Sequence, residues 1–77
     1  MGHALKTQQS LVQNVWLAPD MVLADAYEIM MQARQEQVFV LDGSDLCGVL
    51  YELDLIRHVS QHGGWATTVV ASVMRRP

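Results

Sequence analysis

The residues best suited to chemistry lie close together, where Tyr51, Glu52 and Asp54 follow a run of apolar residues. A carboxylate held just after a strand end can accept hydrogen bonds from two hydroxyl groups of a ligand. The pattern therefore favours ligand binding at Asp54 over catalysis. The simpler interpretation is that Asp54 only stabilises the positive end of a helix dipole.

The sequence contains no set of residues typical of an enzyme or a metal site. It has no glycine-rich phosphate loop and no serine-histidine-acid set. Glu52 and Asp54, two residues apart at a strand end, are expected to point in different directions. His58 and His62 are four residues apart on one expected helix face, but no cysteine or acidic residue stands at a conventional ligand spacing. We predict neither an enzyme nor a bound metal.

The composition describes a small acidic domain with more apolar surface than it can bury. The 77 residues carry a net charge of −3, and 51% of them are hydrophobic. A chain of this length buries only roughly 60% of its unfolded surface. We therefore expect a second copy to cover part of the remaining apolar surface, which predicts a homodimer.

Charge, cysteine content and apolar runs limit the partners and the compartment. The basic residues are scattered along the chain, which argues against a nucleic acid partner. Arg75 and Arg76 are interpreted as solvated, or as phosphate contacts if the tail folds back. The single cysteine, Cys47, excludes an internal disulfide and suits a reducing compartment. No apolar run approaches the roughly 20 residues of a membrane helix, so we predict a cytoplasmic protein with no membrane partner.

Periodicity and turn residues predict an α/β chain with the element order β-α-β-β-α. The predicted strands are 15–17, 38–41 and 46–51, and the predicted helices are 22–35 and 53–61. Asp20 is the expected N-cap of the first helix. One face of that helix is apolar and is expected to be buried; it comprises Leu23, Ala26, Tyr27, Met30 and Ala33.

The central hairpin and the second helix follow from turn residues and burial patterns. Residues 38–41 are predicted to be buried on both faces, because their apolar side chains do not alternate with polar ones. Residues 42–45, Asp-Gly-Ser-Asp, predict the hairpin turn. Gly48 indicates the close approach of another backbone or a ligand. The second helix ends at the Gly63-Gly64 pair, and the residues it offers to the core are Leu53, Leu55, Ile56 and Val59.

This ordered set of motifs resembles the cystathionine-β-synthase (CBS) domain, a small regulatory module. The family pattern opens with a Pro-Asp turn and a helix containing Ala and Met, here Pro19-Asp20, Ala26 and Met30. It continues with two strands and a helix that opens on Asp. The matching residues here are Val40-Leu41-Asp42, Gly48-Val49-Leu50 and Asp54-Leu55-Ile56.

The resemblance implies a three-stranded mixed sheet with two main helices. Residues 15–62 form the CBS motif, and residues 1–14 form an N-terminal arm or lead-in helix. Residues 63–77 resemble the start of a further motif, and we expect them to form either a short strand or one helical turn. One complete motif is thus expected where the family usually has a tandem pair.

The resemblance also implies ligand sensing without catalysis. Two CBS motifs commonly pack sheet to sheet, and adenosine-type ligands lie in the clefts between them, so a single motif would need a second chain. The implied ligand is AMP, ATP or S-adenosylmethionine, and no cofactor is required. In the family the helix-opening Asp, here Asp54, holds the ribose hydroxyls. The adenine would lie against backbone and aliphatic side chains near Leu17 and Val38.

Three positions depart from the family pattern. Tyr51 stands where a Thr or Ser usually helps to bind ribose or phosphate, Phe39 replaces a Pro, and Arg34 replaces the Gly after the first helix. Tyr51 could stack on a base or donate its hydroxyl to the ligand. Alternatively, Tyr51 and Phe39 fill the cleft, and the domain serves only for dimerisation or protein interaction. Both functions remain open at the level of the sequence.

Overall fold

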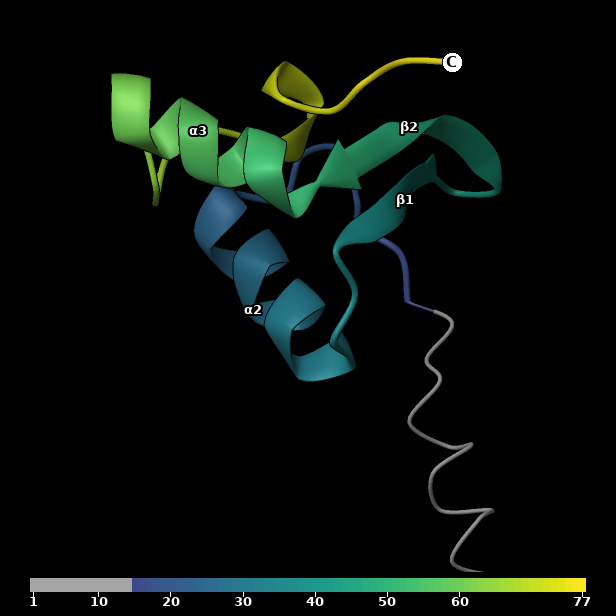
Figure 1. Ribbon diagram of the computed structural model, residues 1–77. Coiled ribbons are helices and arrows are strands. Elements are labelled where there is room, and N and C mark those ends of the chain that lie inside the picture. Colours follow the sequence, from purple (N-terminus) through teal and green to yellow (C-terminus); the bar gives the residue numbers. More distant parts are fainter. Residues whose placement is uncertain (1–14) are drawn as a thin grey trace, which may run out of the picture.

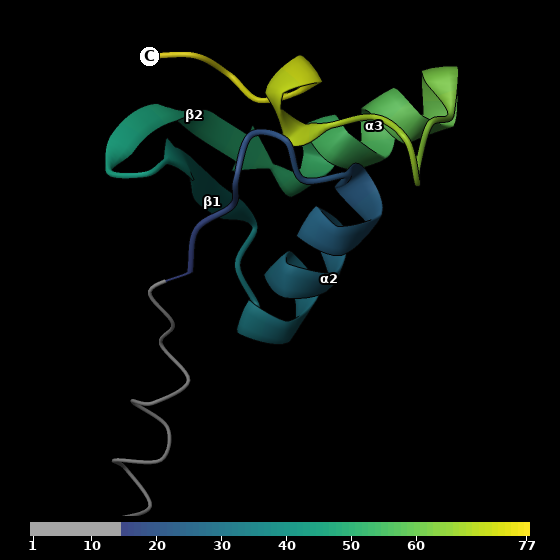
Figure 2. The same ribbon diagram turned by 180° about the vertical axis from the view of Figure 1, so that it is seen from behind.

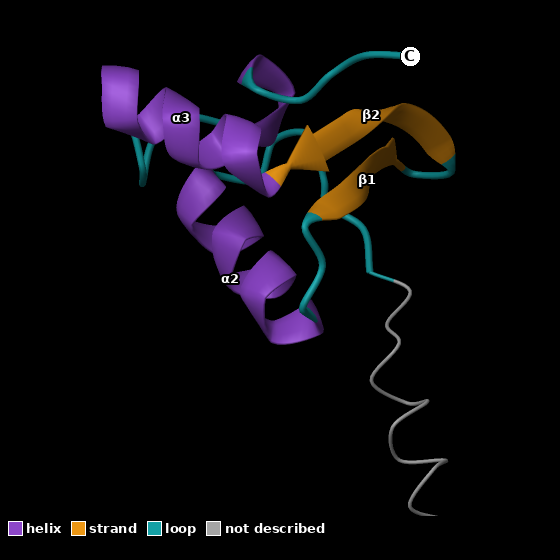
Figure 3. Cartoon of the chain, in the orientation of Figure 1, coloured by secondary structure: helices purple, strands orange, loops and turns teal. Residues whose placement is uncertain are grey.

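The computed structural model describes residues 15–77, so the predicted arm at residues 1–14 lies outside the described residues. Helix, strand, strand and helix follow one another in the predicted order, and a short 3-10 turn, η1, comes near the end of the chain (Figures 1 and 3). Their bounds are α2 Leu23–Ala33, β1 Gln37–Asp42, β2 Asp45–Tyr51, α3 Glu52–His62 and η1 Val70–Ser72.

Helix α2 buries the face that the 3.6-residue period predicts. Leu23, Ala26, Met30 and Ala33 are all buried, and Tyr27 packs at the edge of the same core. The helix ends at Arg34, whose φ of 57° places it in the left-handed region. The family pattern has glycine at this position, and the left-handed backbone explains the preference, since glycine adopts it without steric cost.

The start of α2 is capped by backbone and not by a side chain. The prediction of Asp20 as the N-cap is wrong: Val22 is the N-cap, and no side chain bonds to the first turn. Instead, the amides of Leu23 and Ala24 each donate at 2.9 Å, to the carbonyls of Thr68 and Trp65. The tail after α3 therefore satisfies amides that have no partner within the helix.

The sheet has two strands, which corrects the predicted three-stranded sheet. The segment predicted as the first strand contributes one parallel bridge, between Leu17 and Val40. There the Leu17 amide donates to the Phe39 carbonyl at 3.0 Å, and the Leu41 amide donates to the Leu17 carbonyl at 2.9 Å. Pairing stops after Leu17 because a turn follows at Pro19, which has no amide hydrogen to donate to a neighbouring strand.

Strand β1 alternates between buried and exposed residues, so the prediction of burial on both faces is wrong. Val38 and Val40 are buried against the helices, whereas Phe39 between them is 59% exposed. The antiparallel register pairs Phe39 with Val49 and places both side chains on the outer face of the hairpin. A β-bulge at Cys47 interrupts the ladder between Val40 and Leu41. The outer face of the hairpin is therefore apolar, and in the single chain it is exposed to solvent.

The end of the chain runs beside β2 in both views of the ribbon (Figures 1 and 2). Residues Met74–Pro77 are here called the C-terminal segment. Arg75 forms an antiparallel bridge with Val49, through hydrogen bonds of 2.8 and 2.9 Å. Gly48 makes this approach possible, since a Cβ atom there would collide with the Arg75 carbonyl oxygen and lie 3.1 Å from the Met74 sulfur. The predicted close approach at Gly48 is confirmed, and the neighbour is the protein's own backbone.

Helix α3 buries less of itself than its sequence predicts. Leu55 is fully buried and Val59 packs against the core, but Leu53 and Ile56 are 69% and 45% exposed. Their predicted burial is therefore wrong, because α3 covers the core with one narrow face. The helix ends at Gly63 as predicted, with φ 73°. Within residues 15–77, no helix is long and apolar enough to span a membrane.

Candidate functional site

A groove of about 480 Å³ lies on the outer face of the hairpin. Phe39 and Tyr51 line it together with Trp16 and Val38, and Gln35 and Gln37 supply polar groups. Pockets that hold small ligands commonly measure roughly 300–1,000 Å³ and combine apolar walls with a few polar groups. Its size and lining therefore suit a flat aromatic ligand.

The four residues predicted to bind ligand occupy three different settings. Val38 packs in the core with only 4% of it exposed, yet it and Tyr51 both line the groove. Leu17 does not: its side chain is fully buried in the core, while its backbone pairs with β1 beside the groove. Asp54 is not part of the groove lining but lies in the first turn of α3, one turn beyond Tyr51. The predicted adenine contact of Leu17 would have to come from its backbone.

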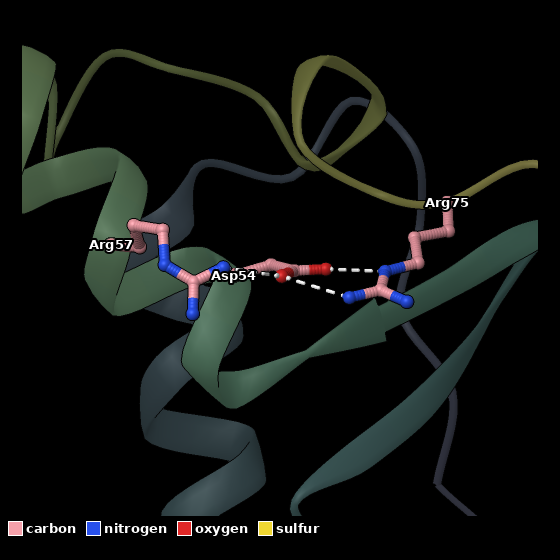
Figure 4. A network of polar contacts seen from close by, with 3 residues as sticks. All are labelled: Asp54, Arg57 and Arg75. Carbon is pink, nitrogen blue, oxygen red and sulfur yellow. Dashed lines mark hydrogen bonds and ion pairs between the residues drawn. The ribbon is translucent and has the colours of Figure 1, made fainter.

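Asp54 carries the densest set of polar contacts in the described chain. The Arg75 Nε donates to Asp54 Oδ2 at 2.7 Å, and Arg75 Nη2 donates to Oδ1 at 3.2 Å. Arg57, one turn along α3, adds an ion pair at 3.6 Å. The two arginines approach the carboxylate from opposite sides (Figure 4). As a result the Asp54 side chain is only 15% exposed.

These contacts keep Asp54 ionised. The hydrogen bond from Arg75 lowers the pKa of the Asp54 carboxyl below its usual value. Partial burial acts in the opposite direction, and the charges of Arg75 and Arg57 lower the pKa further. Asp54 is therefore a hydrogen-bond acceptor at neutral pH, which is the state that a ligand with two hydroxyl groups requires.

Tyr51 connects the groove to the Asp54 cluster. The Arg75 guanidinium lies 4.6 Å from the centre of the Tyr51 ring, within the range of a cation–π contact. Tyr51 thus lines the groove while its ring supports the arginine bound to Asp54. The sequence analysis considered Arg75 only as a solvated residue or a phosphate contact, and it missed the pairing of Arg75 with Asp54. The signal was Gly48, which indicated a backbone neighbour without saying which segment supplies it.

The described part of the chain does not provide the ligands of a metal centre. Residues 15–77 contain no cluster of three or more His, Cys, Asp or Glu side chains able to hold an ion. The rings of His58 and His62 lie 4.9 Å apart on α3, as their spacing predicts, but they are a pair without a third ligand.

Comparison with known families places this arrangement in context. The family model of the CBS domain matches residues 11–61, which is more than half of the chain. The chain belongs to the CBS domain family. No protein of curated function matches the sequence. The match indicates no catalytic family.

Solved structures agree on the fold. A cystathionine beta-synthase domain protein fused to a Zn-ribbon-like domain superposes with a TM-score of 0.77 at 17% identity, over 82% of this chain and 91% of that one. The CBS domain of a bacterial CNNM/CorC family Mg²⁺ transporter, in complex with ATP, gives a TM-score of 0.72 at 25% identity, over 87% and 48%. CBSX2 in complex with AMP gives 0.63 at 21% identity, over 80% and 50%. The chain spans about half the length of these two nucleotide-bound structures.

Proposed function

We propose that this domain is a regulatory module that binds an adenine nucleotide or related adenosyl ligand without catalysing a reaction. The observation that carries the proposal is the groove on the outer face of the hairpin, with ionised Asp54 just beyond its Tyr51 wall. The complexes of two similar folds with ATP and AMP support the ligand class. AMP, ATP and S-adenosylmethionine share the adenosine part that the groove would hold.

Each part of the ligand has a partner of suitable chemistry. The adenine ring would lie in the groove between apolar side chains, where Tyr51 and Phe39 offer aromatic surfaces for stacking. The ribose hydroxyls would donate to the Asp54 carboxylate. The positive end of the α3 dipole favours the negative charge of that carboxylate.

The proposed active form is a homodimer in the cytoplasm. The outer face of the hairpin leaves Trp16, Phe39 and Leu46 more than half exposed. Exposed apolar residues that cluster in this way mark a surface that a partner covers. A second copy packed sheet to sheet would bury them and close the open side of the groove. Sedimentation at micromolar concentration tests this, and a folded protomer that stays monomeric would contradict it.

The ligand is tested by thermal denaturation of the protein with AMP, ATP or S-adenosylmethionine. A ligand at 100 times its dissociation constant stabilises the folded state by about 2.7 kcal/mol. The wild type should show this shift, and Asp54→Ala should lose it. Asp25→Ala is the matched control, since Asp25 is an exposed carboxylate in the first turn of α2. It should respond to the ligand as the wild type does.

The alternative is a dimerisation or protein-interaction module that binds no ligand. The observation that favours it is the Asp54 carboxylate, which Arg75 and Arg57 already occupy. In a dimer, Phe39 and Tyr51 of each copy could then fill the groove of the other. The absence of any thermal shift at millimolar nucleotide, with dimerisation intact, would establish this function over ligand sensing.

A further inference from the structure

The carboxylate that would hold a ribose is occupied by the protein itself. Both Asp54 oxygens accept hydrogen bonds from Arg75, in the two-point geometry that two neighbouring ribose hydroxyls would require. With the side chain only 15% exposed, little of the carboxylate is accessible to a ligand. A ribose and the Arg75 guanidinium therefore compete for the same acceptor atoms.

Arg75 is held at this position by its backbone as well as its side chain. The bridge to Val49 fixes the main chain on the edge of β2, and Gly48 gives the carbonyl of Arg75 the space it needs. The guanidinium then extends over the Tyr51 ring to reach Asp54. One residue thus joins the edge of the hairpin, the wall of the groove and the carboxylate.

We propose that the C-terminal segment, Met74–Pro77, is an internal competitor of the ligand. In the free protein Arg75 occupies Asp54 and the segment is anchored on β2. A ligand whose hydroxyls bind Asp54 releases the guanidinium, and the Arg75–Val49 bridge loses its side-chain anchor. The inference rests on the proposed function, because it needs a ligand that uses Asp54.

This competition provides a mechanism for transmitting the binding event. A ligand shifts a conformational equilibrium only by its difference in affinity for the two states. Here the difference arises at Asp54, which is available only when Arg75 has left. By reciprocity, anything that pulls the C-terminal segment away from β2 must raise the affinity for the ligand by the same factor.

Adenosine is the sharpest probe, because it has the ribose hydroxyls but no phosphate. Removal of a positive charge would weaken the binding of a nucleotide for electrostatic reasons alone, and adenosine avoids this effect. Arg75→Ala should bind adenosine about 1.5- to 5-fold more tightly than the wild type, since exposed ion pairs have effects of that order. Arg76→Ala is the matched control: it removes the same charge from the neighbouring residue, which joins no ion pair within residues 15–77.

Salt dependence and hydrogen exchange provide readouts on the unmodified protein. Rising salt screens the Arg75–Asp54 pair, so adenosine should bind the wild type more tightly as salt increases, and this trend should be absent in Arg75→Ala. The amides of Val49 and Arg75 form the bridge. Their exchange should become faster when the wild type is saturated with adenosine.

The outcomes separate this inference from the proposed function. If adenosine binds the wild type and Arg75→Ala binds it equally or more weakly, Arg75 is not a competitor, while the ligand-binding function stands. Unchanged or slower exchange of the two amides on saturation would lead to the same conclusion. Adenosine, AMP, ATP and S-adenosylmethionine can each be tested on the wild type and on both arginine variants. If none of these compounds binds to any of the three proteins, both the inference and the proposed function are wrong.

Discussion

Substitution of Gly48 by alanine tests the attachment of the C-terminal segment to β2. A Cβ atom at residue 48 would overlap the carbonyl oxygen of Arg75, and this atom is backbone that cannot move by a simple rotamer change. Either the hairpin absorbs the extra methyl group, or the segment leaves β2. Overpacking by one methyl group costs about 1–3 kcal/mol. Detachment of the segment breaks two backbone hydrogen bonds, at about 0.5–1.5 kcal/mol each.

Both routes lead to the same expected loss of stability. The free energy of unfolding of Gly48→Ala should fall by about 1–3 kcal/mol, since the protein adopts whichever of the two conformations has the lower free energy. For a domain of this size, each kcal/mol lowers the melting temperature by roughly 4–8 °C. Urea denaturation measures the loss, and hydrogen exchange at the Val49 and Arg75 amides shows which route the protein takes.

Gly43→Ala is a suitable control for Gly48→Ala. Gly43 lies in the hairpin turn with φ 65°, and apart from its immediate neighbours in the chain no residue has an atom within 4 Å of the position of an added Cβ. Alanine there should cost about 1–2 kcal/mol through its left-handed backbone, but the Val49 and Arg75 amides should remain protected. The reasoning about close approach fails if Gly48→Ala is as stable as the wild type and keeps both amides protected.

Three further substitutions test separate parts of the structure. Leu17→Ala should lower the free energy of unfolding by about 2–5 kcal/mol in urea, because the side chain is fully buried; a smaller loss would place it in the groove and not in the core. Arg34→Gly should increase the free energy of unfolding by about 0.5–1 kcal/mol and raise the melting temperature, since φ 57° suits glycine. A melting temperature below that of the wild type would contradict the backbone strain inferred at this residue. Because the folded-state pKa of Asp54 is lowered, its contribution to stability is fully present above the usual value of 3.8 and is lost as the pH falls through the folded value. The stability difference between wild type and Asp54→Asn, measured by urea denaturation, should therefore shrink as the pH is lowered into the acid range, and a difference that does not change with pH would refute the ion-pair argument.

Local patterns in the sequence predict the elements of this domain well. The spacing of Leu23, Ala26, Met30 and Ala33 predicts the buried face of α2, because a helical period of 3.6 residues fixes which side chains share a face. The Asp-Gly pair at residues 42–43 predicts the hairpin turn, since Gly43 adopts a positive φ. Gly63 likewise marks the end of α3.

Predictions that depend on how much surface the neighbouring elements cover are less successful. Phe39, Leu53 and Ile56 have the residue types of a core, yet all three are exposed in the single chain. The hydrophobicity of a side chain indicates that it favours burial, but it does not indicate which element or partner covers it. The exposed face of the hairpin is consistent with a partner surface, which one chain cannot supply for itself.

The sequence by itself determined the local structure and the family, because helical period, turn residues and motif order act over short distances along the chain. It also placed an acidic residue at the start of α3. Only the tertiary structure decided what that residue contacts: Arg75 lies 21 positions after Asp54. The two side chains meet because a distant segment pairs with the edge of β2 beside Gly48. No periodicity encodes such a contact, since it depends on the path of the backbone in space.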